Sequence, residues 1–214
     1  MIKAMQRHSE DTGVQQNGCG CLWNLAVWGA SPVPCNAGPC ASADGDAADD
    51  NKKRIAEAGG ISQVIAALHN HSGVGLVQYH GLGALRNLAC NGAFIEGVTR
   101  VRNGCADITF IWLGVVVCVG IAPCLPTDSN KAEIARLDGI DVVLTAMQSH
   151  ETHVGIQEQG CAAIANLALD DMNRRAIASK GGIKLVENAR NLHPHSNEVQ
   201  EHSATALKNL RLAV

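Results

Sequence analysis

The sequence predicts an all-α protein built as an array of one repeated helical unit. One phrase recurs around four asparagines, as GCGCLWNLA, GLGALRNLA, GCAAIANLA and SATALKNLR. A Gly-Gly-Ile or Asp-Gly-Ile turn lies 26 positions before three of these asparagines, and a further asparagine lies 10 positions before each turn's isoleucine. Self-similarity at a fixed spacing is typical of units that bury a core by stacking on one another. The residues of this asparagine column are Asn24, Asn87, Asn166 and Asn209.

Each unit is predicted to contain three helical segments. We expect Asn51 to cap the first segment, KKRIAEA, and Gly59 and Gly60 to end it. The second segment begins at Ile61, Ile140 or Ile183 and has apolar residues at helical spacing. A polar turn follows, and the third segment contains the repeated asparagine. Small residues in that segment allow neighbouring helices to approach closely.

Two insertions interrupt this pattern. Asn166 and Asn209 are 43 positions apart, whereas the other two gaps are 63 and 79 positions, and the surplus of 20 and 36 residues falls in the same short connection. The length of 43 lies in the range of roughly 40–47 residues that HEAT and armadillo units occupy. The predicted organisation is a truncated first unit at 1–26, an insertion at 27–50, a unit at 51–90, an insertion at 91–129, a unit at 130–172 and a C-terminal unit at 173–214.

The insertions differ in composition from the units. The first is rich in Ala, Gly, Pro and Asp, which predicts a disordered loop. The second contains the apolar run from Ile108 to Leu125, at the lower limit of a bilayer span. A membrane helix there would separate two halves of one array, so we expect a loop, a collapsed hairpin or an artefact. Our hypothesis is that both are translated non-coding sequence or recent insertions, which sequencing of the transcript tests.

Composition excludes several classes of protein. The net charge of −3 gives no electrostatic argument for binding nucleic acid or an anionic membrane. The N-terminal segment MIKAMQRHSEDTG lacks the apolar stretch of a signal peptide.

The cysteines fall into two groups. Cys19 and Cys161 share a repeat position that Leu82 and Ala204 also occupy, which predicts buried apolar sites. Free thiols indicate an intracellular location, the cytoplasm, with the nucleus left open. Five further cysteines fall in the insertions: Cys35, Cys40, Cys105, Cys118 and Cys124.

Motifs of catalysis and of metal binding are absent from the sequence. It contains no glycine-rich phosphate loop, no GxSxG and no HExxH, and its cysteine pairs lack zinc spacing. We therefore expect no enzyme activity, no cofactor and no metal site.

The phrases NRRAIASKGGIKLV and IQEQGCAAIANLA resemble the signatures of the armadillo-repeat family, and the resemblance covers all of the chain except the insertions. It implies a right-handed α-α superhelix, an armadillo-type solenoid, interrupted by two long irregular insertions. The third helices would then line a concave groove. The chain is also similar to the armadillo segments of vacuolar scaffold proteins and large leucine-rich-repeat kinases. No polar capping unit is evident, and the chain is compatible with a piece of a longer array.

The resemblance implies a role for the asparagine column. In this family, asparagines at this place bind the main chain of an extended peptide, because a side-chain amide offers both a donor and an acceptor. The alternative is that each asparagine ties its own unit to its neighbour. The tryptophan that importin-like receptors carry four residues earlier is missing here, which disfavours recognition of basic nuclear-import signals. We expect Trp23 to be a packing residue instead. The residues in the tryptophan position are Gly20, Gly83, Ala162 and Thr205.

Two further columns accompany the asparagines. The first lies seven residues before them, on the same helical face, and predicts either a polar stripe along the groove or an ordinary solvated face. Its members are Asn17, His80, Gln159 and His202. The second column consists of histidines 16 positions before the asparagines. We interpret these as polar residues that end the second helix, in preference to a metal ladder or a pH switch. They are His8, His71, His150 and His193.

These features predict a non-catalytic scaffold that binds a protein or peptide segment along the concave groove. The alternative is a targeting or regulatory fragment of a larger multidomain protein, for example a kinase or a vacuolar scaffold. Neither nucleic acid nor a membrane is an expected partner, and the sequence does not define the oligomeric state.

Overall fold

The computed structural model describes residues 1–27, 45–90 and 128–211, and these ranges contain eleven α-helices and no strand. The all-α prediction is therefore confirmed. The helices are α1 (Ile2–Arg7), α2 (Thr12–Val27), α3 (Gly45–Glu57), α4 (Gly60–Asn70), α5 (Gly75–Ala89), α6 (Asp128–Arg136), α7 (Gly139–Ser149), α8 (Val154–Leu167), α9 (Asp171–Ser179), α10 (Gly182–Leu192) and α11 (Asn197–Arg211).

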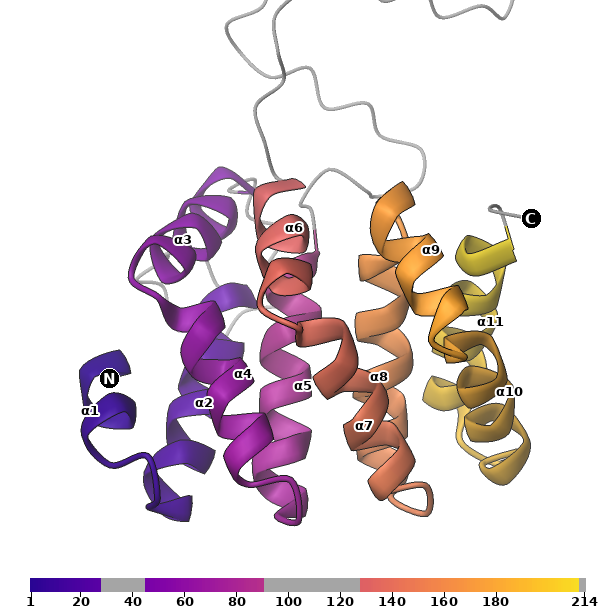
Figure 1. The fold of residues 1–214 in the computed structure, drawn as a ribbon, viewed down its shortest axis with the longest axis horizontal. Helices are drawn as coiled ribbons and strands as arrows, with labels where there is room; N and C mark the ends of the chain where they lie inside the picture. The colour runs from indigo at the N-terminus through magenta and orange to yellow at the C-terminus, as the bar shows by residue number, and fades with distance from the viewer. Residues whose placement is uncertain (28–44, 91–127, 212–214) are drawn as a thin grey trace, which may run out of the picture.

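The helices form four units that lie side by side in chain order (Figure 1). The first unit consists of α1 and α2, and each later unit has a first, a second and a third helix. The second helices α4, α7 and α10 lie toward the viewer in Figure 1, and the third helices lie behind them. Among the described helices, the most extensive contacts are those between successive third helices, α2 with α5, α5 with α8 and α8 with α11. The third helices are thus the layer on which the units stack.

Glycines let the second and third helices of a unit pack closely. A Cβ atom on Gly81 would lie 2.6 Å from the Leu68 side chain, and one on Gly160 would lie 2.4 Å from Met147. Real Cβ atoms do not approach other atoms so closely, so an alanine at either position would require the neighbouring side chain or the helix itself to shift.

The turn between the first and second helices is built on one left-handed residue. Gly59 and Gly181 adopt φ angles of 77° and 83°, a region that favours glycine because it has no Cβ. Asp138 occupies the equivalent position with φ 59°. The predicted glycine stop after the first helix is therefore confirmed.

The prediction that Asn51 caps its helix is wrong. Helix α3 begins at Gly45, so Asn51 lies inside it, and the N-cap of α9 is Asp170, whose carboxylate accepts from the Asn173 backbone N–H at 2.9 Å. The repeated asparagines of the first helices reach back to the preceding unit instead. Asn130 Nδ2 donates to the Leu88 carbonyl at 3.2 Å, and Asn173 Nδ2 to the Lys131 carbonyl at 3.3 Å.

A glutamine nine residues before each asparagine of the column joins the second helix to the third. In the second unit, Gln78 is buried, and its Nε2 donates to the Leu68 carbonyl at 2.8 Å and the His71 carbonyl at 3.0 Å. The same pair of bonds recurs in all four units, between 2.7 and 3.1 Å. These bonds reach carbonyls in the last turn and at the C-cap of the second helix, where regular helical hydrogen bonding ends. The glutamine column consists of Gln15, Gln78, Gln157 and Gln200.

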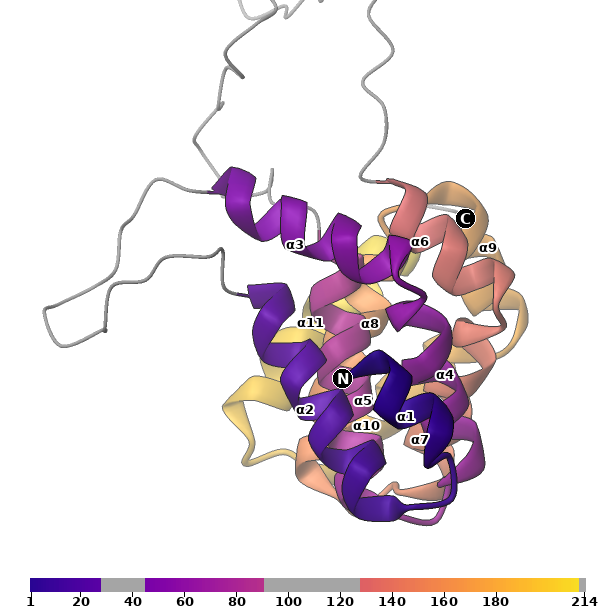
Figure 2. The same ribbon diagram turned by 90° about the vertical axis from the view of Figure 1, so that its left-hand side faces the viewer.

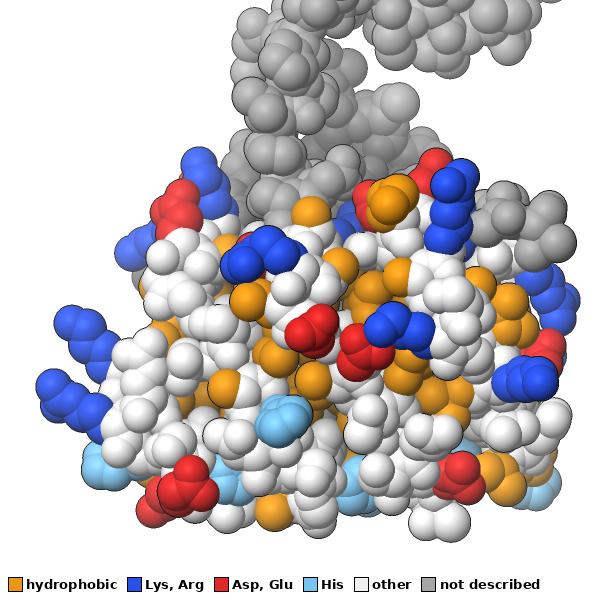
Figure 3. All heavy atoms as spheres, viewed as in Figure 1, with side chains coloured by type: hydrophobic (Ala, Val, Ile, Leu, Met, Phe, Trp, Pro, Cys, Tyr) orange, Lys and Arg blue, Asp and Glu red, His pale blue; other side chains and the backbone are white. Residues whose placement is uncertain are grey.

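The histidine column joins neighbouring units. His71, His150 and His193 are the C-cap residues of their second helices, as the sequence predicted. Each ring also places Nε2 2.7 Å from the carbonyl oxygen of the residue that follows the previous histidine: Ser9, Ser72 and Glu151. Histidine side chains accordingly gather along the lower edge of the molecule (Figure 3). Among the described residues, no group of three or more His, Cys, Asp or Glu could hold a metal ion.

Most of both insertions, residues 28–44 and 91–127, lies outside the described ranges, and so do the apolar run from Ile108 to Leu125 and the five cysteines of the insertions. The last residues of each insertion are described and helical: residues 45–50 belong to α3, in place of the predicted disordered loop, and residues 128–129 belong to α6. No helix in the described part of the chain is long and apolar enough to cross a membrane. The prediction for Cys19 and Cys161 is confirmed, because both are fully buried and burial raises the pKa of each thiol to about 12.

Candidate functional site

The asparagine column lies on consecutive third helices and forms a ladder of hydrogen bonds. Asn87 Nδ2 donates to the Trp23 carbonyl at 3.2 Å, Asn166 Nδ2 to the Arg86 carbonyl at 2.9 Å, and Asn209 Nδ2 to the Ala165 carbonyl at 2.9 Å. Each acceptor is the residue before the previous asparagine. The amide nitrogen therefore ties each unit to its neighbour, as one reading of the sequence predicted.

The amide oxygens of the same asparagines differ from the nitrogens in their hydrogen bonding. Within the described residues, no hydrogen bond reaches Oδ1 of Asn87, Asn166 or Asn209, and each of these residues is half-buried. A side-chain amide oxygen can accept two hydrogen bonds. Because the bond to the preceding unit fixes the amide plane, the oxygens form a row of oriented acceptors, one on each stacked helix.

The second predicted column is less uniform than the sequence suggested. Asn17 is exposed, while His80 is half-buried with Nδ1 3.2 Å from the Gln16 carbonyl oxygen. Gln159 departs from the expected exposed stripe, because only 2% of it is accessible. Its Oε1 accepts a hydrogen bond from Arg86 at 3.1 Å. The partly exposed Arg86 side chain, and not that of Gln159, is therefore accessible at the surface of the third-helix layer.

Arg86 is the centre of a charged cluster that spans three units. Its guanidinium lies 3.9 Å from the Glu158 carboxylate on α8 and lowers the pKa of His202 on α11. Burial is the larger cause of the His202 shift, which Glu201 and Glu198 oppose. Burial also raises the pKa of Glu158, an effect that Glu198 reinforces, whereas Arg86 and a hydrogen bond from Gln159 oppose it. Sequence reasoning missed Arg86 because Trp23, Ala165 and Lys208 fill its column without a common chemistry.

An aromatic cluster adjoins the ladder between α2 and α5. The rings of Trp23 and Tyr79 meet edge to face, with centroids 5.2 Å apart, and His80 lies 6.1 Å from Trp23. A Cβ atom on Gly83 would lie 2.5 Å from the indole ring. Trp23 therefore fills the space that the missing side chain of Gly83 leaves, which confirms the predicted packing role of Trp23.

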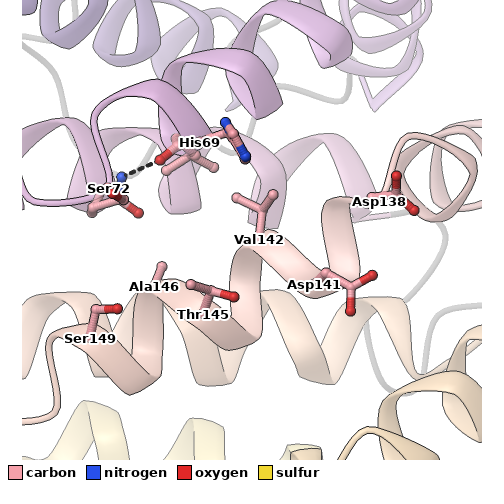
Figure 4. A pocket seen from close by; sticks show the side chains of 10 residues that line it. His69, Ser72, Asp138, Asp141, Val142, Thr145, Ala146 and Ser149 are labelled. Carbon is pink, nitrogen blue, oxygen red and sulfur yellow. Dashed lines mark hydrogen bonds between the residues drawn. The ribbon is translucent and has the colours of Figure 1, made fainter.

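A hollow lies on the other side of the molecule, between the second helices α4 and α7. It has a volume of about 590 Å³ and is lined by residues of both helices. Figure 4 shows Val142 and Thr145 of α7 on one wall and His69 on the other. Charged residues of both signs are scattered over this side of the molecule (Figure 3), and Asp141 at the rim is paired with Lys180 at 2.5 Å. No sequence signal pointed to this hollow, because it depends on the spacing of two packed helices.

No protein-family model matches the chain, and no solved structure matches it. The chain is similar to Protein aardvark of Dictyostelium discoideum, with 36% identity over 91 residues. The match covers 42% of this chain and 11% of aardvark, so the chain spans only a small part of the length of that relative.

Proposed function

We propose that this protein is a non-catalytic scaffold of the armadillo type, a right-handed superhelix that binds an extended protein segment along its third-helix face. The observation that carries the proposal is the row of oriented amide oxygens on Asn87, Asn166 and Asn209, one on each stacked helix. The likeness of the repeated phrases to armadillo signatures supports the same conclusion, as do the four side-by-side units.

The spacing of the row suits an extended chain. Packed helices lie roughly 8–10 Å apart, and an extended chain advances about 3.3 Å per residue. Successive oxygens therefore meet main-chain N–H groups about every third residue of the segment. Since the amide planes are already held by hydrogen bonds to the preceding unit, little side-chain freedom is lost on binding, which favours affinity. The function is positioning, and no covalent bond is made or broken.

A peptide-display experiment tests this function. Random 12-residue peptides are selected on the full chain, and the enriched peptides are measured by fluorescence polarisation against wild type and the double variant Asn87→Ala, Asn166→Ala. Loss of two hydrogen bonds of about 1 kcal/mol each predicts affinity weaker by at least tenfold. The matched control is Thr145→Ala with Ser149→Ala on α7, where we expect no change.

Thermal melts of each variant show whether it is folded at the assay temperature, so that weaker binding is not a consequence of unfolding. A selection that yields no peptide, or peptides that bind both double variants equally, counts against the proposed function. Binding lost only in the α7 variant would move the site to the hollow between α4 and α7.

The comparison with aardvark favours a second candidate. The matching stretch makes up 11% of that protein, so a segment like this one occurs there within a much longer chain. The second candidate is accordingly a targeting or regulatory segment of a larger intracellular protein. Transcript sequencing tests it: an open reading frame that continues upstream of Met1 or beyond Val214 supports the candidate, and stop codons on both sides contradict it.

A further inference from the structure

We propose that the end face formed by α1 and α2 is a docking surface for one more helical repeat of the same kind. Figure 2, in which this end of the row faces the viewer, shows α1 and α2 in front of the other helices. The inference rests on the stacking of the units and not on the peptide-binding function, so either can fail without the other.

A stripe of apolar residues is exposed or half-buried on α2, whereas the equivalent residues of α5, α8 and α11 are buried. On α2 the stripe consists of Val14, Cys21 and Leu25, which are 7 and 4 positions apart and share one helical face. Val14 is half-buried, Cys21 is exposed, and Leu25 is 47% exposed. The equivalent residues of the later units are at most 1% exposed; they are Val77, Ala84 and Leu88, then Ile156, Ala163 and Leu167, then Val199, Ala206 and Leu210.

The last unit shows which neighbouring helices cover this apolar stripe. On α11 the stripe is fully buried although no described unit follows, so it is covered by helices that precede α11. The face of α2 therefore lacks the cover that the first helix and the preceding unit give to α5, α8 and α11. Leaving such a continuous apolar face in water is unfavourable, and on the later units the same face is an established interface.

Two hydrogen-bond donors on this end face occupy the positions that join the other units. At three junctions, the asparagine amide and the histidine ring each bond a carbonyl of the preceding unit. Asn24 and His8 are the equivalent residues of the first unit, both are exposed, and neither side chain makes such a bond within the described residues. The end face thus presents the same donors, in the same register, as the internal junctions.

A hollow on this end face is lined in part by the stripe. Its volume is about 400 Å³, and its lining includes Met5 of α1 and Val14, Asn17 and Cys21 of α2. The hollow is bounded by side chains of both helices of the unit, as the seat of a neighbouring helix would be.

Exposed residues at the opposite end of the molecule, on α11, indicate which kind of repeat can dock on the end face formed by α1 and α2. Positions of the third helix that face the next unit carry buried Cys161 and Ala168 on α8, but the equivalent residues of α11 are Ala204 and Arg211, both exposed. The column one residue before the asparagine likewise ends in exposed Lys208. A polar outer face is typical of a capping repeat, although none was evident from the sequence. These charges would meet the apolar stripe if a second copy docked head to tail. The occupant is therefore a repeat whose outward face carries small apolar residues.

Thiol labelling of Cys21 tests this inference. In the full chain, six other cysteines are replaced by serine, which leaves Cys21 exposed beside the buried Cys19 and Cys161. A copy of residues 130–172 followed by a copy of 130–142 is then fused directly before Met1, because Met1 is in register with Val143. In the copy, Cys161 is replaced by alanine. The six serine replacements are at Cys35, Cys40, Cys90, Cys105, Cys118 and Cys124.

We expect the extension to slow maleimide labelling of Cys21 at least tenfold. The matched control carries Ala165→Lys and Ala168→Arg in the copied unit, which reproduces the polar face of α11, and its Cys21 should react as fast as in the unextended chain. An extension that is helical by circular dichroism but leaves Cys21 equally reactive overturns the proposal. Equal protection by the control also overturns it.

Leu25→Glu in the unextended chain tests the same face even if the extended chain does not fold. In the unextended chain, Leu25→Glu should leave the melting temperature unchanged within experimental error, whereas Leu88→Glu at the buried equivalent should lower it strongly. A comparable loss from Leu25→Glu would show that the face already serves this chain's own fold. Self-association in light scattering that Leu25→Glu abolishes would assign the face to a second copy and overturn the choice of occupant.

Discussion

Replacing Gln78 with methionine isolates the contribution of the glutamine column to stability. Methionine has a similar length and no hydrogen-bonding amide, so the change removes the donor to the carbonyls of Leu68 and His71 without opening a large cavity. The His71 carbonyl keeps a second bond, from the Val74 backbone N–H at 3.0 Å. The Leu68 carbonyl loses its bond from the amide in a buried setting.

The magnitude follows from these contacts. Each of the two hydrogen bonds makes a net contribution of about 0.5–1.5 kcal/mol to the free energy of unfolding, and a buried carbonyl left without its partner costs about 1–3 kcal/mol. Since the methionine recovers some apolar burial, we expect a loss of about 2–3 kcal/mol in the free energy of unfolding. For a chain of this size, that loss lowers the melting temperature by about 4–12 °C.

Urea unfolding followed by far-ultraviolet circular dichroism measures the loss. Two matched controls accompany it: Gln200→Met removes the same pair of bonds at a half-exposed site, where water replaces the amide, and Gln148→Met changes an exposed residue of α7. We expect a smaller loss for Gln200→Met and none for Gln148→Met. If Gln78→Met stays within about 0.5 kcal/mol of wild type, the amide bonds do not stabilise the unit and the reasoning fails.

Substitutions of Gly83, Asp138 and His202 test the close packing, the left-handed turn and the buried histidine. Gly83→Ala places a Cβ 2.5 Å from the Trp23 ring, so the chain should lose about 1–3 kcal/mol in a denaturant melt, while Gly73→Ala, with no atom within 4 Å, should have no such packing cost. Asp138→Gly relieves the left-handed backbone at φ 59° and should raise the stability by up to about 1 kcal/mol, and a lower melting temperature would contradict that reason. Because burial lowers the pKa of His202 below 6.5, its stabilising contribution is present above pH 6.5 and is lost as the pH falls through the folded-state pKa. Melting temperatures between pH 7.5 and about 5 should therefore fall more for wild type than for His202→Gln, and parallel curves would refute the assignment.

The repeated unit could be predicted from the sequence because helical spacing and glycine turns are local properties. The positions of Ile61, Gly59 and Gly181 identified the second helices and their left-handed turns, and the structure agrees. The asparagine column was also identified from the sequence alone. Its amide nitrogen proved to join neighbouring units, which only the packing of the third helices reveals.

Other features depend on tertiary contacts and were missed or misread. The glutamine column was present in the sequence, but a polar residue within a helix is usually a solvated one, and the burial of Gln78 shows otherwise. Asn51 was taken for a cap because the start of α3 at Gly45 lies in a segment without apolar periodicity. Arg86 covers Gln159 because the two lie on neighbouring helices 73 positions apart in the sequence.

The most direct test of the proposed function is a ¹⁵N–¹H spectrum of the chain titrated with a display-selected peptide. Side-chain amide resonances report on the asparagines themselves. We expect the signals of Asn87, Asn166 and Asn209 to shift on binding, whereas those of the exposed Asn70 on α4 and Asn188 on α10 stay in place. Shifts confined to Asn70 and the backbone of α4 and α7 would contradict binding at the asparagine column and place the partner in the hollow between the second helices.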